Sequence, residues 1–246
     1  FIASTFIAIV SGVIGVFVVA RRMSFLTHTL SEIGFAGASF AVFAGWQSLN
    51  GMLLFTMLSS VMVGQMSIKE SRREAVISAV SALFIGLGIL FLSLSNQTAS
   101  SATSILFGSV VGISKREVWQ LVLLSLLVLA VVFLMYRHLK FDSFDPVGAR
   151  VNGVNGTLVS VTFLILVALS VSVAAQIVGS LLIFILLTLP AAAAKYYATG
   201  TAKMIGLAIL FALLGTWLGL YLGYVTNWPI SFFIAVIEVV IYVSAL

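Results

Sequence analysis

The sequence predicts an all-α, polytopic membrane protein with about eight or nine transmembrane helices, forming one domain over residues 1–246. Hydrophobic residues make up 62% of the chain and charged residues only 8%, whereas soluble domains are about half apolar and a quarter charged. The apolar residues form runs of the roughly 20 residues that a spanning helix needs. Lysines and arginines lie between these runs, so the net charge of +5 reflects membrane topology and indicates no nucleic-acid partner.

Apolar runs that end at charged or turn-forming residues define the expected helices. In chain order, we expect them over residues 1–20, 24–45, 51–67, 75–95, 118–136, 157–175, 177–194, 204–225 and 230–246. The stretch 95–114 is polar and then only weakly apolar, and its second half is too short to span. It predicts a partial or re-entrant helix, which requires protein around its backbone.

The positive charges predict the orientation of the chain. If Arg21 and Arg22 are cytoplasmic and the helices alternate in direction, ten of the twelve lysines and arginines lie inside. Only Lys115 and Arg116 lie outside. This bias follows the positive-inside rule and places the long polar loop at about 137–156 in the cytoplasm.

That loop contains the signals of a short helix. Pro146 suits a first helical turn, Asp145 suits the capping position before it, and Gly153 suits a stop after it. Such a helix at the cytoplasmic surface could dock a soluble partner, although a solvated connector has the same composition.

Among the seven acidic residues, only Glu32 and Glu238 lie within apolar runs. The other five lie beside basic residues, where solvated pairing is expected. His28 precedes Glu32 by four residues, so both side chains project from one helix face with Cβ atoms about 5–6 Å apart. Intramembrane ionisable groups commonly mark function. Glu238 stands alone, and we expect it to bond to a neighbouring helix or to lie near an interface.

Three interpretations of the His28–Glu32 pair stay open: a buried hydrogen bond, a metal site and a proton relay. An imidazole and a carboxylate can bind Mn, Zn or Fe, but the remaining ligands must come from other helices, a second copy or water. The chain has no cysteine, which excludes thiolate ligands. It also has no Walker, GxSxG or HExxH motif, so we expect no enzyme activity and place any ATPase in another chain.

Four stretches, in order, resemble the permease subunit of the ABC-3 family of metal-ion ABC transporters. "GVFVVARRMSFLTHTLSEIGFAG" is similar to its RRM-x-x-x-GDALSHA helix, and "SILFGSVVGIS" to its YLFGS segment. "FDPVGARVNGVN" resembles its FDPEFARALGVN loop, and "AAQIVGSLLIFILLTLPAAAAKYY" its VVGxLLVxALLxxPAATA segment. The family's aspartate falls on His28 and its histidine on Glu32, so the two donor types occur here in reversed order.

The resemblance implies a permease of the bacterial plasma membrane that imports manganese, zinc or iron and holds no permanent cofactor. It implies a homodimer with a pathway between the copies, cytoplasmic ATP-binding subunits and an extracellular substrate-binding protein that delivers the ion, which we expect near 95–104. His28 and Glu32 would bind the passing metal. The residues that would face the ATPase are Asp145, Pro146, Ala149, Arg150 and Gly153.

Two rival functions stay open at this stage. A proton-coupled secondary transporter would use His28 and Glu32 as a relay. A membrane scaffold without transport would use them only for packing.

Overall fold

The computed structural model describes residues 1–65, 70–95, 105–108, 114–180 and 182–246, and every regular element in these segments is a helix, as predicted. The helices are α1 (Ile2–Ala20), α2 (Ser24–Phe43), α3 (Ser48–Gln65), α4 (Glu70–Leu94), α6 (Lys115–Phe144), α7 (Pro146–Val151), α8 (Gly156–Val178), α9 (Ile183–Tyr197), α10 (Thr201–Thr226) and α11 (Ile230–Ser244). Most of the predicted re-entrant stretch lies outside the described residues, but 105–107 are helical.

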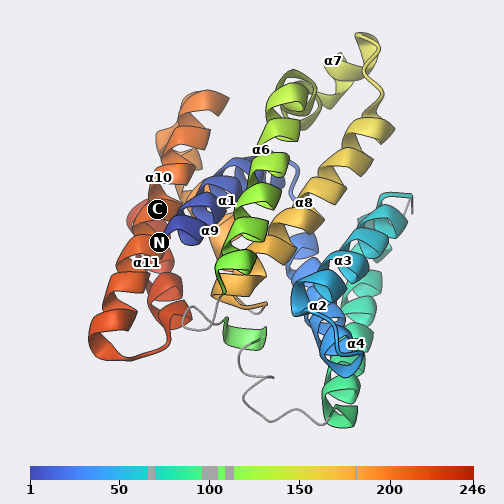
Figure 1. The fold of residues 1–246 in the computed structure, drawn as a ribbon. Coiled ribbons are helices and arrows are strands. Elements are labelled where there is room, and N and C mark those ends of the chain that lie inside the picture. Colours follow the sequence, from blue (N-terminus) through green and yellow to red (C-terminus); the bar gives the residue numbers. More distant parts are fainter. Residues whose placement is uncertain (66–69, 96–104, 109–113, 181) are drawn as a thin grey trace.

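Helices α1 and α8 form the centre of the bundle (Figure 1). Helices α2, α3 and α4 pack together on one side, and α9, α10 and α11 pack together on the other. In the apolar windows of α1 and α8, 72% of residues are buried, against 28% in α6 and 33% in α10. The two central helices therefore make the core, while α6 and α10 turn apolar side chains outward, as lipid contact permits.

Helix α2 differs from its neighbours in hydropathy. Within the described residues, α1, α6, α8 and α10 are long and apolar enough to cross a membrane, and shorter apolar helices lie in α3, α4, α9 and α11. Helix α2 meets neither description, because His28, Glu32 and several hydroxyl side chains lower its mean hydropathy. The helix that carries the predicted site is thus absent from both groups of apolar helices.

The packing of α2 against α3 depends on two glycines. A Cβ atom at Gly37 or at Gly51 would overlap the backbone carbonyl of the other residue. Small residues allow this close approach of helix backbones, as in many membrane proteins. Any larger side chain at either position would push α2 away from α3.

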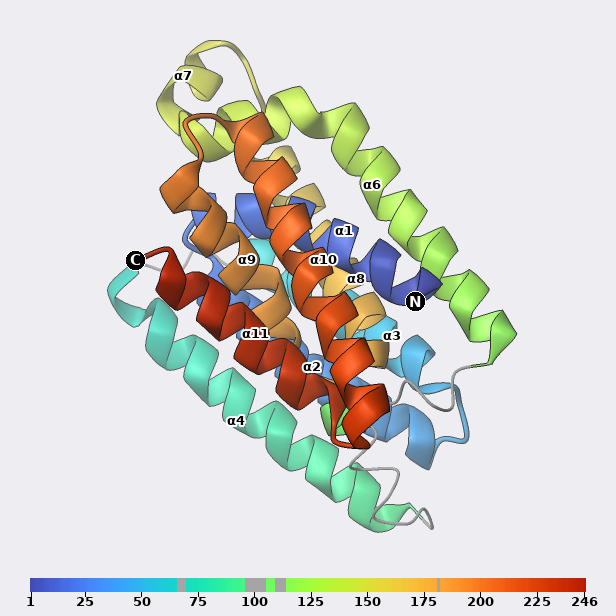
Figure 2. The ribbon, with the colours of Figure 1, turned by 90° about the vertical axis from the view of Figure 1, so that its left-hand side faces the viewer.

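Helix α6 is longer than the predicted 118–136. It begins at a capping box, in which the Ser114 hydroxyl accepts a hydrogen bond from Glu117 N–H and the Glu117 carboxylate accepts one from Ser114 N–H. Its 30 residues span ~45 Å, more than the ~30 Å of bilayer hydrocarbon. Most of the predicted loop at 137–156 is therefore helix. Figure 2 shows α6 along one edge of the bundle, with α7 beyond its end.

The break between α8 and α9 lies a few residues later than predicted. Helix α8 continues to Val178, and Gly179 then adopts a positive φ of 89°. A side chain on Gly179 would overlap the backbone of residues 106–108. Both the backbone conformation and the close contact thus require glycine at this break.

Candidate functional site

The His28–Glu32 pair lies on one face of α2, as predicted. His28 Nε2 and Glu32 Oε1 are 3.8 Å apart, and the side chains are 38% and 13% exposed. This separation is too long for a hydrogen bond, which needs about 2.7–3.2 Å between nitrogen and oxygen. Of the three interpretations left open for the pair, a hydrogen bond between its two side chains is therefore not what the structure shows.

Each member of the pair keeps one buried polar atom without a partner. Among the described residues, nothing hydrogen-bonds to His28 Nδ1 or to Glu32 Oε2. Most buried polar atoms in proteins are partnered, because an unmade hydrogen bond leaves the desolvation cost uncompensated. The pair thus presents a nitrogen and an oxygen that can each bind a ligand.

Aromatic rings fix the position of the His28 imidazole. Phe184 of α9 stacks on it with ring centroids 4.9 Å apart and an angle of 27° between the planes. Phe25 meets it edge-on at 6.4 Å. A shift of α9 relative to α2 would therefore move the imidazole. Phe184 was not predicted as a site residue, since it lies in an apolar run with no distinguishing signal.

The pair is not a complete metal site by itself. The described residues contain no cluster of three or more histidine, cysteine, aspartate or glutamate side chains able to hold a metal. One chain therefore offers two donors here, and further ligands must come from water or another copy of the chain.

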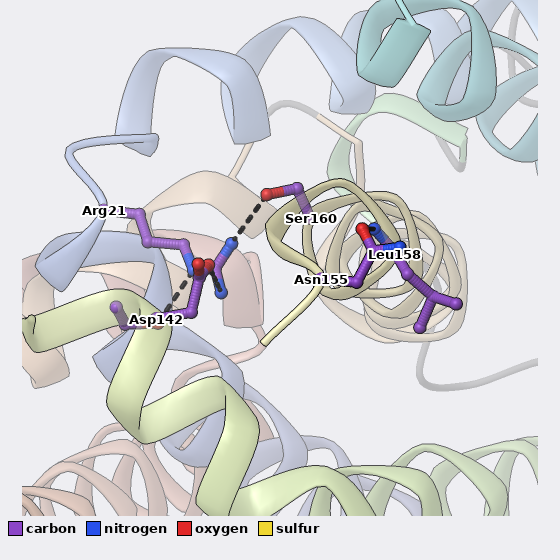
Figure 3. A network of polar contacts seen from close by, with 6 residues as sticks. Arg21, Asp142, Asn155, Leu158 and Ser160 are labelled. Atoms are coloured by element: carbon purple, nitrogen blue, oxygen red, sulfur yellow. Dashed lines mark hydrogen bonds and ion pairs between the residues drawn. The ribbon is translucent and has the colours of Figure 1, made fainter. Parts of the chain in front are cut away.

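A second polar group, which we call the Arg21 cluster, joins the turn after α1 to α6 and α8 (Figure 3). It consists of Arg21, Asp142, Ser143, Ser160 and Phe163. Arg21 Nη2 forms an ion pair with Asp142 Oδ2 at 2.8 Å, and Nε donates to Ser143 Oγ at 2.8 Å. Nη1 donates to Ser160 Oγ at 3.4 Å, and the guanidinium lies 4.6 Å from the centroid of the Phe163 ring.

The charges of the Arg21 cluster are largely removed from water. The Arg21 side chain is 7% exposed and the Asp142 side chain 11%. Burial lowers the pKa of the Arg21 guanidinium, and the Asp142 carboxylate raises it. The group remains cationic, because an arginine starts from a very high pKa. The expectation that Asp142 is a solvated loop residue is wrong: it lies in α6 and holds that helix to α1.

Helix α7 forms between α6 and α8 as the sequence predicts. Asp145 Oδ1 accepts a hydrogen bond from Gly148 N–H at 2.9 Å, Pro146 occupies the first turn, and Gly153 has a φ of 75° after the last turn. Asn155 in turn caps α8 by accepting from Leu158 N–H at 3.2 Å (Figure 3).

Helix α7 turns an apolar surface outward. Val147 is 72% exposed and Val151 is 83% exposed, with Arg150 exposed between them. Ala149 is fully buried against the chain. Four of the five residues expected to face a partner are exposed: Asp145, Pro146, Arg150 and Gly153. The fifth, Ala149, is buried and packs the helix against the rest of the chain. The two valines were not predicted as part of this surface.

The sequence profile of the ABC 3 transport family matches residues 1–246. The chain belongs to this family. The resemblance found in four motifs is therefore confirmed, and this ABC 3 family chain is a multi-pass bacterial membrane protein. The family consists of ABC transporter permeases, which are not themselves catalytic.

Individual relatives match this ABC 3 family chain over most of its length. It is 30% identical to the manganese transport system membrane protein MntC of Listeria monocytogenes, covering 92% of this chain and 81% of the relative. It is 31% identical to the manganese import system permease protein ScaB of Streptococcus pneumoniae, covering 98% and 84%. The solved structure of PsaBC from S. pneumoniae has the same fold, with a TM-score of 0.88 at 24% identity, covering 99% of this chain and 88% of the other.

Proposed function

We propose that the chain is the permease subunit of an ATP-driven importer of divalent transition-metal ions, with manganese ahead of zinc and iron as cargo. The observation that carries this proposal is the presence of two unpartnered donors, His28 Nδ1 and Glu32 Oε2, on one face of α2 in an ABC 3 family chain. Imidazole nitrogen binds Zn and Fe, and carboxylate oxygen suits Mn. The relatives named for manganese transport favour manganese among these metals.

The two donors suit transient binding. A single chain supplies one nitrogen and one oxygen, and a second copy would supply another of each, giving four donors where two chains meet. An extracellular binding protein would deliver the ion to the outer mouth, which we expected near 95–104; residues 96–104 lie outside the described part of the chain. Because each subunit would supply only part of the metal ligands, the ion could leave once the two copies move apart.

The route from ATP to the metal runs through α7. Separate cytoplasmic ATP-binding subunits would contact the surface formed by Val147, Arg150 and Val151. The Arg21 cluster holds the ends of α6 and α8 that flank α7, and it holds both to α1. Arg21 precedes His28 by only seven residues, so a movement of α7 would reach the start of α2.

Uptake by the full complex tests the metal proposal. Cells expressing the permease with its ATPase and binding protein would be given Mn, Zn or Fe, comparing wild type with Glu32→Gln. We expect the variant to lose at least about tenfold in uptake, equivalent to about 1.4 kcal/mol, because the amide replaces an anionic ligand by a neutral one. The matched control is Glu117→Gln, which changes a capping carboxylate outside the site and should retain uptake.

Reconstitution separates the importer from its two rivals. The purified chain alone in vesicles should not transport metal under a pH gradient, and transport should begin once the ATPase subunits and ATP are added. Gradient-driven transport by the chain alone would favour the proton-coupled alternative, which family membership does not favour. Unchanged uptake in the double variant His28→Ala with Glu32→Ala would leave only a structural role for the pair.

A further inference from the structure

Glu238 occupies an unusual position between α10 and α11. The residue is fully buried, and neither carboxyl oxygen has a hydrogen-bond partner among the described residues. The side chain lies against Gly215 of α10: a Cβ atom there would overlap Glu238 Oε1 and lie 2.8 Å from Cδ. The carboxyl thus fills the space that the missing side chain leaves. Of the two expectations for Glu238, a bond to a neighbouring helix or a place near an interface, the described residues contain no such bond.

The surrounding packing does not need an acid at this position. Gly215, Gly219 and Gly223 follow each other at four-residue spacing on α10, and a Cβ atom at each would crowd one residue of α11. Gly219 faces Ile234 and Gly223 faces Ile230 in the same way that Gly215 faces Glu238. The residue that faces the glycine is isoleucine in two of these three contacts, which shows that an apolar side chain suits this interface. In the third contact, the facing residue is Glu238, whose side chain has a similar length.

In the described part of the chain, no charged side chain compensates an ionised Glu238. Helices α9 and α10 pack against α11, and their charged residues are Lys195 and Lys203, both exposed. Lys203 precedes Gly215 by twelve residues, ~18 Å along the helix axis. The tyrosines of the three helices are Tyr196, Tyr197, Tyr221, Tyr224 and Tyr242. Within the described residues, none of these groups forms an ion pair or hydrogen bond with the Glu238 carboxyl, and the neighbouring Thr216 hydroxyl donates to Ala212 O instead.

We propose that Glu238 is a proton-binding site, at which each chain holds one proton while α10 and α11 are packed together. An ionised carboxylate buried without a partner carries a large desolvation cost, whereas the protonated form is neutral. A metal ion is a poorer occupant, because the described residues place no cluster of acidic or histidine ligands here. Because the packed arrangement binds a proton that a separated, hydrated carboxyl would release, rising pH weakens the packing of α11 on α10.

Infrared spectroscopy of the complete transporter complex tests the proposal without using uptake as a readout, so the result does not depend on the cargo. A protonated carboxyl has a carbonyl stretch that a carboxylate lacks. At neutral pH we expect such a band in the wild type and its loss in Glu238→Gln, with no such loss in the control Glu117→Gln. A spectrum in which Glu238→Gln removes only carboxylate absorption would overturn the proposal. Glu238→Met, which places an apolar side chain at this position, replaces the amide variant if that variant does not assemble.

The pH dependence of unfolding provides a second measurement. The melting temperature of the wild-type complex should fall more steeply than that of Glu238→Gln as the pH rises from mildly acidic to alkaline. The difference arises because unfolding of the wild-type chain releases a proton from Glu238, which rising pH favours, whereas the variant has no such proton. Parallel curves for the two proteins would show that Glu238 does not change its protonation in this range and would overturn the proposal.

Discussion

The Arg21 cluster and the His28–Glu32 pair begin seven residues apart in the sequence, yet they differ in how their polar groups are satisfied. In the Arg21 cluster, Arg21 Nη2 lies 2.8 Å from Asp142 Oδ2 in an ion pair without hydrogen-bond geometry, and two serine hydroxyls accept hydrogen bonds from Nε and Nη1. In the pair, nitrogen and oxygen are 3.8 Å apart, and each side chain retains a buried atom without a partner among the described residues.

This difference separates a structural site from a binding site. A buried guanidinium that forms a close ion pair and donates to two serine hydroxyls has little capacity left for a ligand, and it holds its helices in one arrangement. Buried polar atoms without a hydrogen-bond partner lower the stability of the folded protein, and their retention is explained if a ligand binds to them. The Arg21 cluster therefore fits the transmission of movement from α7, and the pair fits the binding of cargo.

The largest effect on stability should come from breaking the Arg21 cluster. Arg21→Met leaves Asp142 charged and buried without its partner, which typically costs about 3–5 kcal/mol in free energy of unfolding. Unfolding of the purified complex in detergent, monitored by circular dichroism, measures this loss. The double variant Arg21→Met with Asp142→Leu should regain much of the stability, since no buried charge is left alone.

The matched change in the other region is His28→Ala. We expect it to cost much less, about 1 kcal/mol or below for the charge contact, because Glu32 has no hydrogen bond to lose. Equal costs for Arg21→Met and His28→Ala would contradict the distinction between the two regions.

A comparable effect, on metal binding rather than on stability, should follow from Phe184→Ala, which removes the ring stacked on His28. Aromatic pairs contribute about 0.5–1.5 kcal/mol beyond their buried area, so the affinity for Mn²⁺ should fall by about two- to tenfold as the imidazole loses its fixed orientation. Titration of the purified complex with Mn²⁺ measures this. Phe184→Tyr keeps the ring and should keep the affinity, and Phe211→Ala removes a ring that packs on Tyr197 instead. A loss of affinity in Phe211→Ala as large as in Phe184→Ala would argue against a specific role for the stack.

Much of the fold could be predicted because membrane helices are continuous apolar runs. Helix α10 was predicted within a few residues, and α7 followed from the local signals of Asp145, Pro146 and Gly153. The end of α6 was missed because residues 137–144 are polar, and polarity alone does not distinguish a loop from a helix that continues beyond the bilayer. Helix α2 was predicted despite its low hydropathy because the charged residues Arg21 and Arg22 mark where it begins.

The site was predictable only where its partners are close in sequence. Four-residue spacing on one helix was enough to bring His28 and Glu32 together. Arg21 lies directly after α1 and Asp142 lies in α6, and only the packing of α1 against α6 and α8 shows that they meet. Phe184 reaches His28 in the same way, through the packing of α9 against α2. For Glu238, the glycines of α10 are visible in the sequence, but their alignment with α11 depends on tertiary structure.

The smallest effect on metal binding is expected from the cap of α7, and it tests whether the Arg21 cluster alone keeps the ends of α1, α6 and α8 in place. Asp145→Ala removes the side chain that accepts from Gly148 N–H, and loss of such a cap costs about 1 kcal/mol. Because the Arg21 cluster is unchanged, α1, α6 and α8 should stay in place while the first turn of α7 frays. We therefore expect Mn²⁺ affinity to be unchanged but the ions imported per ATP hydrolysed to fall, and Asp145→Asn, which can still cap, to behave as the wild type. If Asp145→Ala instead weakens Mn²⁺ binding as much as Phe184→Ala does, then the cap and the metal site belong to one cooperative unit, and the division between the two regions is wrong.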